Sequence, residues 1–187
     1  MRTALLLIDI QNDYFPGGAM ELVAADHASG QAGLLLARFR EGAGPVFHVQ
    51  HLSARPTATF FRPSTPGVEI HSSVLPMSGE TVVNKSFPNS FRETSLLEAL
   101  RAADVGKLVI AGMMTHMCVD TTVRAAADLG FACTLAHDAC ATRDLSFGGQ
   151  TVAASAVQAA YMAALNGSFA NVLSAAEIGA ALLSDEA

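Results

Sequence analysis

The chain has 187 residues, of which 51% are hydrophobic and 15% are charged, and its formal net charge is −6. This composition excludes an intrinsically disordered protein and predicts a single domain, residues 1–187, with a sizeable core. Because no run of lysine or arginine is present, we expect neither nucleic acid nor an anionic membrane surface as a partner.

The N-terminal segment, Thr3 to Asp9, is apolar up to its last residue. This pattern predicts a strand that is covered on both faces of a parallel sheet. The segment is too short to span a membrane, and no cleavage site of a signal peptide follows it. Together with an odd number of cysteines, three, this predicts a cytoplasmic, reducing location. Asp9 ends the predicted strand, at the edge where open parallel sheets bind ligands.

The next elements are predicted to be a helix over 26–41 that ends at glycines, and a strand over 45–50. The irregular segment 52–76 then carries four prolines and the aromatic pair Phe60 and Phe61. Loops of this length in a compact domain are usually functional. We therefore expect it to form part of a substrate-binding wall.

A strand is predicted over 81–84, with Lys85 at its carboxyl end, followed by a helix over 94–103 and a strand over 107–111. A helix should start near Cys118. The later elements are predicted as a strand over 131–135, a polar loop over 138–149, a helix over 151–166, a strand over 169–172 and a helix over 174–183. This alternation predicts a three-layer α/β/α fold with a doubly wound, mostly parallel sheet of about six strands.

Three reactive side chains, Asp9, Lys85 and Cys118, follow predicted strands. A parallel sheet brings the carboxyl ends of its strands to one edge, so we expect these three groups to meet there. A carboxylate, a cation and a thiol together can activate a nucleophile. At a helix start, Cys118 would also face unpaired backbone N–H groups, which would favour its thiolate form.

The chain resembles the isochorismatase-like cysteine hydrolases, a family that includes nicotinamidases and N-carbamoylsarcosine amidases. The resemblance rests on four segments in family order: LLLIDIQNDYF (5–15), VNKSFPNSF (83–91), AGMMTHMCVDTTVRAAADLGF (111–131) and HDACAT (137–142). It implies a catalytic triad of Asp9, Lys85 and Cys118 and a cis peptide bond between Met113 and Met114. It also implies an oxyanion hole built from the backbone N–H groups of Met114 and Cys118.

These residues permit the hydrolysis of a small amide or ureido substrate. Asp9 would accept the thiol proton, the thiolate would attack the carbonyl carbon, and Asp9 would then protonate the leaving nitrogen. Water activated by Asp9 would hydrolyse the thioester, so we expect no cofactor and no metal. Two alternatives stay open: isochorismatase-type vinyl-ether hydrolysis, and a catalytically idle member that binds ligands or serves in an assembly. The resemblance also implies a homo-oligomer, either a dimer or a tetramer.

A metal site depends on the histidines that follow the second strand. Nicotinamidases of this family have an Asp-x-His pair there, plus a later histidine, and bind a divalent ion. The corresponding segment FHVQHLS (47–53) contains His48 and His51, and His71 follows, but no carboxylate stands among them. A two-histidine site with water ligands is a further possibility. The missing carboxylate nevertheless favours a metal-free amidase.

The predicted substrate wall is aromatic and sulfur-rich, which would suit a small, partly apolar or planar carboxamide. Ordinary core packing is the alternative for each of its members. We expect Gln11 and Asp13 to tie down the first loop, and Cys133 and Cys140 to be unpaired core or loop residues. The predicted wall consists of Phe15, Met20, His51, Phe60, Phe61, Phe87, Phe91, Met113 and Met114.

Overall fold

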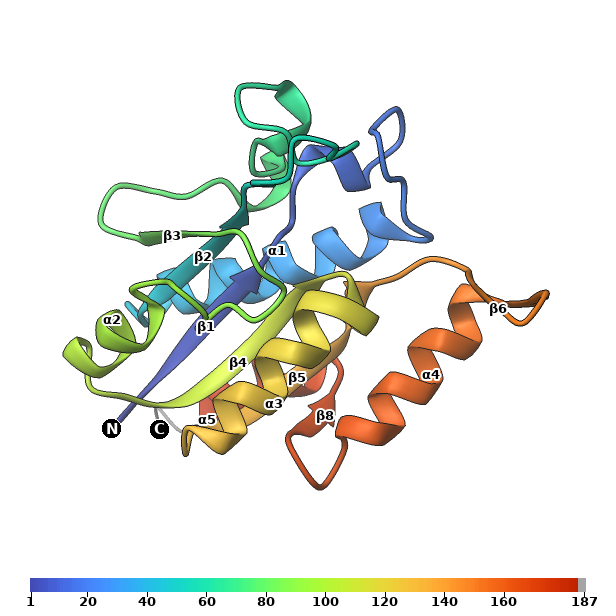
Figure 1. The fold of residues 1–187 in the computed structure, drawn as a ribbon. Helices are drawn as coiled ribbons and strands as arrows, with labels where there is room; N and C mark the ends of the chain where they lie inside the picture. Colours follow the sequence, from blue (N-terminus) through green and yellow to red (C-terminus); the bar gives the residue numbers. More distant parts are fainter. Residues whose placement is uncertain (185–187) are drawn as a thin grey trace.

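Six parallel strands form the central sheet of the computed structural model, which describes residues 1–184. Their order across the sheet is β3-β2-β1-β4-β5-β8 (Figure 1). The sheet confirms the predicted α/β class with a six-stranded parallel sheet. The strands are β1 (Arg2–Ile8), β2 (Val46–His51), β3 (Thr81–Lys85), β4 (Val105–Met113), β5 (Ala132–Ala141) and β8 (Asn171–Leu173).

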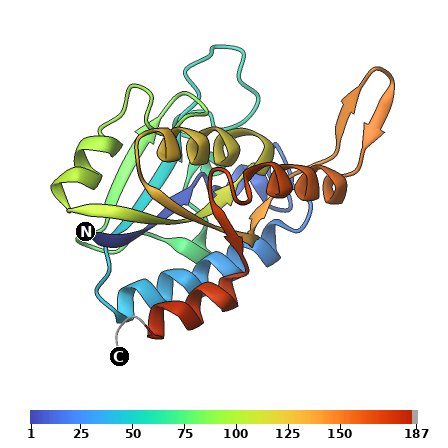
Figure 2. The ribbon, with the colours of Figure 1, turned by 90° about the horizontal axis from the view of Figure 1, so that it is seen from below.

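Helices cover both faces of this sheet, as Figure 2 shows. Helices α1 (Ala25–Glu41) and α5 (Ala175–Ser184) pack on one face, where they share a hydrophobic cluster with Leu5 and Leu7 of β1. The opposite face carries a second cluster, to which Leu6 and Ile8 of the same strand contribute. Alternate residues of β1 thus enter opposite clusters, as the pleat requires. The second cluster is covered by α2 (Leu96–Ala102), α3 (Asp120–Asp128) and α4 (Ala154–Leu165).

Strand β5 is longer than predicted, and the expected loop over 138–149 is wrong. The strand continues to Ala141 because it pairs again with β4 after an irregularity, with Gly112 opposite Cys140 and Met113 opposite Ala141. His137 and Asp138 interrupt the apolar pattern on which the predicted strand end was based, although the strand continues through both residues. The rest of the expected loop contains an antiparallel hairpin, β6 (Leu145–Phe147) and β7 (Gln150–Val152).

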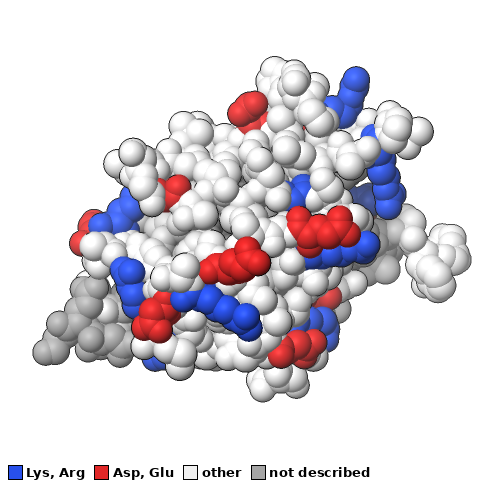
Figure 3. All heavy atoms as spheres, turned by 60° about the vertical axis from the view of Figure 1, so that its left-hand side comes forward, with Lys and Arg blue, Asp and Glu red and all other residues white. Residues whose placement is uncertain are grey.

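This hairpin projects away from the body of the molecule (Figure 2). Its turn contains Gly148 and Gly149, both with positive φ, as tight hairpin turns require. Phe147 at the turn is 89% exposed. Acidic and basic side chains are interspersed over the face shown in Figure 3. Within residues 1–184, none of the helices combines the length and the apolar character that crossing a membrane requires.

The order of the strands locates the functional edge of the sheet. From β1 the chain adds β2 and β3 on one side, and then β4, β5 and β8 on the other. The direction of winding therefore reverses between β1 and β4. Open parallel sheets bind ligands at such a point, outside the carboxyl ends of the strands.

Candidate active site

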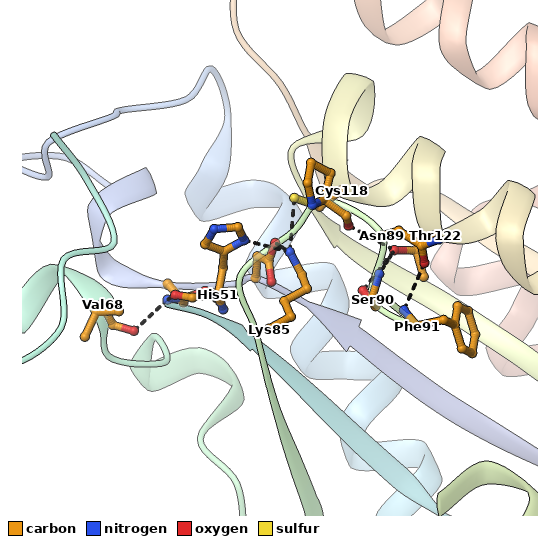
Figure 4. A network of polar contacts seen from close by, with 11 residues as sticks. His51, Val68, Lys85, Asn89, Ser90, Phe91, Cys118 and Thr122 are labelled. Atoms are coloured by element: carbon orange, nitrogen blue, oxygen red, sulfur yellow. Dashed lines mark hydrogen bonds and ion pairs between the residues drawn. The ribbon is translucent and has the colours of Figure 1, made fainter. Parts of the chain in front are cut away.

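Three of the predicted catalytic side chains meet at the reversal point between β1 and β4. Asp9 follows β1 with a left-handed φ of 52°, and its N–H donates to the carbonyl of Val49 at 3.0 Å. Lys85, the last residue of β3, places its Nζ 2.7 Å from Oδ2 of Asp9. The same Nζ donates to Sγ of Cys118 at 3.2 Å (Figure 4). All three side chains are buried, with Cys118 only 6% exposed.

The turn that carries Cys118 leaves the carboxyl end of β4. The Met113–Met114 peptide bond is cis, as the resemblance implies. A π-helical segment, Thr115–Val119, follows and leads directly into α3, so Cys118 lies one turn inside the helical region rather than at its start. The Thr115 hydroxyl has two acceptors, the Ala141 carbonyl at 3.2 Å and Oε1 of Gln158 at 2.7 Å. This contact ties the turn to β5 and α4.

The electrostatics of Cys118 differ from the sequence-based expectation. Burial raises the pKa of the thiol, the negative charge of Asp9 raises it further, and the Lys85 ammonium offsets this only in part. The resting group is therefore a thiol, and the predicted thiolate at a helix start is wrong. A reaction at this sulfur would need a proton acceptor, and the Asp9 carboxylate is the neighbouring group that could take the proton.

Lys85 has a third partner that the sequence did not reveal. Its Nζ lies 2.9 Å from Nδ1 of His51, the last residue of β2. Burial alone would lower the pKa of Lys85, but its interactions with the Asp9 carboxylate and with Cys118 outweigh burial, so that the pKa is raised. The amine is therefore a cation that donates to His51. It follows that the neutral imidazole carries its hydrogen on Nε2.

Gln11 fixes His51 through the backbone. Its Oε1 accepts the N–H of His51 at 2.8 Å, and its Nε2 donates to the carbonyl of His51 at 3.0 Å and to that of Val68 at 2.7 Å. Asp13 accepts the N–H of Phe61 at 2.6 Å and that of Ala19 at 3.2 Å. The prediction that Gln11 and Asp13 tie down the first loop is confirmed.

The predicted substrate wall is assembled only in part. Phe91 packs over Phe131 with their centroids 6.1 Å apart, in the cluster beneath α2 and α3, and Met113 is fully buried. Both side chains thus pack in hydrophobic clusters, and their contact with a substrate stays a prediction. Phe15 stacks on the ring of His71 at 3.6 Å, which fixes it in the packing of the loops.

Two other aromatic residues lie nearer to the triad. Phe61 is buried with its ring 5.7 Å from that of His51, and Phe60 stands 5.0 Å from Phe61. A hollow of about 120 Å³ adjoins Lys85, and Phe87 lines it. The other residues around this hollow are Leu52, Asn84, Ser86 and Glu93.

Tyr14 is a site residue that sequence reasoning missed. It is almost fully buried and packs edge-on against Phe61 at 4.6 Å. Burial raises the pKa of Tyr14 well above the usual value, and the neighbouring Asp9 carboxylate raises it further, so the phenol adjoins the triad and stays protonated. The position of Tyr14 a few residues after Asp9 in the sequence was the available signal that it lies near the site. The hydrophobic pattern of this segment did not predict its conformation.

The histidines do not assemble a nicotinamidase-type metal site. Nε2 of His48 lies 2.8 Å from Oε2 of Glu80, which Arg40 also contacts, and Nδ1 of His71 lies 2.9 Å from the hydroxyl of Ser73. His51 is committed to Lys85. Each of these histidines therefore has a different partner among the described residues, and a two-histidine metal site would require these contacts to break first.

The neutral His51 predicts a loss of stability in acid. Burial and the charge of Lys85 lower its pKa from 6.5 to about 4. Between these values the unfolded chain binds a proton that the folded chain does not, so the free energy of unfolding should fall as the pH drops from 6.5 toward 4. The urea concentration at the unfolding midpoint should decrease between pH 7 and pH 4.5, and this decrease should be smaller for His51→Asn than for the wild type. The control His27→Asn, on the exposed side of α1, should retain the wild-type loss; equal losses in all three proteins would contradict the assignment.

Comparison with known proteins agrees with the fold. The isochorismatase domain family matches residues 3–177. The isochorismatase family protein YddQ of Bacillus subtilis is 51% identical over 172 residues, 92% of this chain and 96% of that protein. A streptothricin hydrolase of Streptomyces noursei is 38% identical over 142 residues, covering 76% of this chain and 50% of its own length.

The solved structures agree as well. The crystal structure of an isochorismatase hydrolase from Oleispira antarctica superposes with a TM-score of 0.93, at 52% identity and 96% coverage of both chains. Similarity of this extent covers the strands that carry Asp9, Lys85 and Cys118 together with the helices that pack around them. The chain therefore belongs to the isochorismatase family.

Proposed function

We propose that this protein is a cysteine-dependent hydrolase that cleaves the C–N bond of a small amide or ureido compound through a thioester. The observation that carries the proposal is the position of the Lys85 ammonium, 2.7 Å from Asp9 and 3.2 Å from the Cys118 sulfur. It gives a nucleophile, a proton acceptor and a fixed positive charge in one buried place. The similarity to a streptothricin hydrolase supports hydrolysis as the reaction.

The reaction begins with a neutral thiol. As Sγ of Cys118 bonds to the carbonyl carbon, its proton moves to the carboxylate of Asp9, one oxygen of which lies within 4.8 Å of the sulfur. The charge that develops on the carbonyl oxygen is met by the backbone N–H groups of Met114 and Cys118. The C–N bond then breaks, Asp9 gives the proton to the nitrogen, and ammonia or an amine leaves.

Hydrolysis of the thioester uses the same carboxylate again. Asp9 removes a proton from water as the oxygen attacks the thioester carbon, and the C–S bond breaks. The proton on Asp9 then returns to the sulfur, which restores the resting thiol. Throughout, Lys85 keeps its charge, which holds the carboxylate and offsets the negative charge on sulfur as it forms. These residues need no metal to complete the cycle.

Cys118→Ala should reduce ammonia release by at least about 10³-fold, because it removes the nucleophile on which the other groups act. The measurement is ammonia release from a panel of primary carboxamides and linear ureido acids, together with mass-spectrometric detection of ring-opened products from lactams, with Cys118→Ser as a second variant. Cys133→Ala is the matched control, since that buried thiol lies outside the site. Intact-mass analysis of acid-quenched mixtures should show an acyl group on Cys118.

Wild-type turnover by Cys118→Ala would contradict the proposed function. Isochorismate belongs in the same panel as a test of the vinyl-ether alternative. Turnover of isochorismate that survives Cys118→Ala, without turnover of any amide, would favour that alternative instead. A panel in which nothing reacts, with no acyl adduct formed, would favour the ligand-binding alternative.

A further inference from the structure

The surroundings of the Lys85 ammonium have the form of a cation-binding site. An ammonium group has three N–H donors. Here they have three acceptors: Oδ2 of Asp9 at 2.7 Å, Nδ1 of His51 at 2.9 Å and Sγ of Cys118 at 3.2 Å. One ion pair with Asp9 and two hydrogen bonds thus surround the ammonium with one oxygen, one nitrogen and one sulfur.

The three acceptors are also potential metal ligands. Ligand atoms of Asp9, His51 and Cys118 all lie within 4.8 Å of one another, and no other group of three such side chains occurs within residues 1–184. A tetrahedral zinc site has ligand atoms roughly 3.5 Å apart, as bond lengths of about 2.0–2.3 Å require. The distances between the ligand atoms would therefore need to shorten by about 1.3 Å at most.

The backbone already holds these ligands in place. Asp9 and His51 end neighbouring parallel strands, β1 and β2, and Gln11 holds His51 by hydrogen bonds to its N–H and carbonyl. Cys118 is fixed by the helical segment that leads into α3. In Figure 4, His51, Lys85 and Cys118 point toward one another from three different elements. Because Lys85 donates to Nδ1 of His51, the lone pair of that nitrogen already faces the centre of the cage.

We propose that Asp9, His51 and Cys118 form a three-ligand cation site, which the Lys85 ammonium fills in the native protein and a thiophilic divalent ion fills when the ammonium is removed. The site is of the open kind, with three protein ligands and a free fourth position. Its oxygen, nitrogen and sulfur donors suit Zn²⁺ or Co²⁺ better than Mg²⁺ or Ca²⁺. The inference concerns the same site as the proposed function but does not depend on the reaction catalysed.

The native ammonium should exclude such an ion. A divalent ion would have to share the cage with a buried positive charge or displace it, and displacement would leave Lys85 buried without its partners. The wild type should therefore stay unloaded at cobalt concentrations that saturate a variant without the ammonium. When a metal ion binds the variant without Lys85, Cys118 should become a thiolate, because the metal replaces the thiol proton.

The test is to add Co²⁺ to purified Lys85→Ala. A sulfur-to-cobalt charge-transfer band in the near ultraviolet and visible bands of four-coordinate cobalt are expected, and the melting temperature should rise by roughly 5 °C at saturation. Lys107→Ala, which removes the other lysine of the chain, an exposed one, is the matched control and should behave as the wild type. Adding Cys118→Ser should abolish the charge-transfer band, and adding His51→Ala should weaken binding at least tenfold.

A folded Lys85→Ala without a cobalt band or a rise in melting temperature overturns the inference, as does a band that persists with Cys118→Ser. If Lys85→Ala does not fold, Lys85→Met, which fills the space without the charge, is judged by the same criteria. If neither folds, both are refolded with Co²⁺; recovery of a folded, cobalt-loaded protein supports the inference, and failure to recover it overturns it. Because no step measures ammonia release, this outcome is separate from that of the proposed function.

Discussion

Replacing Asp9 with asparagine should lower amide turnover by about 10²–10⁴-fold, the range lost when a general acid–base group is removed. The same variant should make Cys118 more reactive toward iodoacetamide near neutral pH. These opposite effects have one cause. Asp9 raises the pKa of the thiol, so its neutralisation leaves Lys85 as the dominant charge and increases the thiolate fraction. The substrate reaction nevertheless slows, because nothing remains to carry the proton to the leaving nitrogen.

The measurement pairs ammonia release with the pH dependence of Cys118 alkylation, followed by peptide mass spectrometry. The alkylation profile of Asp9→Asn should shift to lower pH than that of the wild type. Asp13→Asn is the matched control, since its buried carboxylate accepts backbone N–H groups of the loop and does not face the sulfur. A shift of the profile to higher pH in Asp9→Asn would show that the carboxylate assists formation of the thiolate at rest, contrary to the present account.

Slow alkylation of the wild type therefore has a specific meaning. A raised thiol pKa predicts slow labelling of Cys118 at neutral pH in a fully active enzyme. Slow labelling alone cannot identify a catalytically idle member of the family. The contrast between the wild type and Asp9→Asn separates an active enzyme from an idle member. Only an active enzyme can lose turnover in Asp9→Asn while Cys118 becomes more reactive toward iodoacetamide.

Gly112→Ala should destabilise the fold by about 4 kcal/mol and lower the melting temperature by roughly 10 °C. Gly112 has a φ of +148° and pairs with Ile8 across β1 and β4. A Cβ at this position would overlap the carbonyl oxygen of Ile8 and lie 2.8 Å from its Cβ. The strands would have to separate at the place where Asp9 and the Cys118 turn diverge from the sheet.

Thermal unfolding of two glycine variants separates the causes. Gly130 has a φ of +90° but open space around an added Cβ. Gly130→Ala therefore tests only the cost of a positive φ in a residue with a side chain, about 1–2 kcal/mol. Gly112→Ala should cost clearly more, and its residual turnover should fall even at temperatures where it stays folded. Equal melting temperatures for the two variants would show that the close approach of β1 and β4 is not required.

The order of strands and helices was predictable because each buried strand is a short apolar run between polar turns. The positions of Asp9, Lys85 and Cys118 followed, since strand ends in a parallel sheet converge. Side-chain directions within irregular segments did not follow. His51 was predicted to contact substrate, but its position opposite Lys85 depends on the register of β2 against β3, in which the two residues are paired. The raised thiol pKa depends on burial, which a helix-start argument does not include.

The packing of two residues of the predicted wall could not be read from the sequence for the same reason. Met113 lies in a strand that continues past the expected end, and Phe91 follows a turn that Ser90 and Thr122 close through a hydroxyl contact of 2.9 Å. Figure 4 shows this second network beside the triad. Neither the Ser90–Thr122 contact nor the pairing of Met113 with Ala141 has a sequence signature, because each joins residues from distant parts of the chain. Apolar character alone could not decide between a wall and the core.

The short segment after β1 fastens loop 52–70 to the body of the protein at several points. Gln11 bonds to Val68 in the loop and to His51 just before it, the side chain of Asn12 donates to the carbonyl of Pro66 at 2.9 Å, and Asp13 accepts the N–H of Phe61. We therefore expect substitutions at exposed loop positions between these contacts to leave the arrangement of Asp9, Lys85 and Cys118 unchanged. If the loop contacts the substrate, as predicted, its outer residues could then be exchanged for those of a relative to change the substrate without rebuilding the active centre.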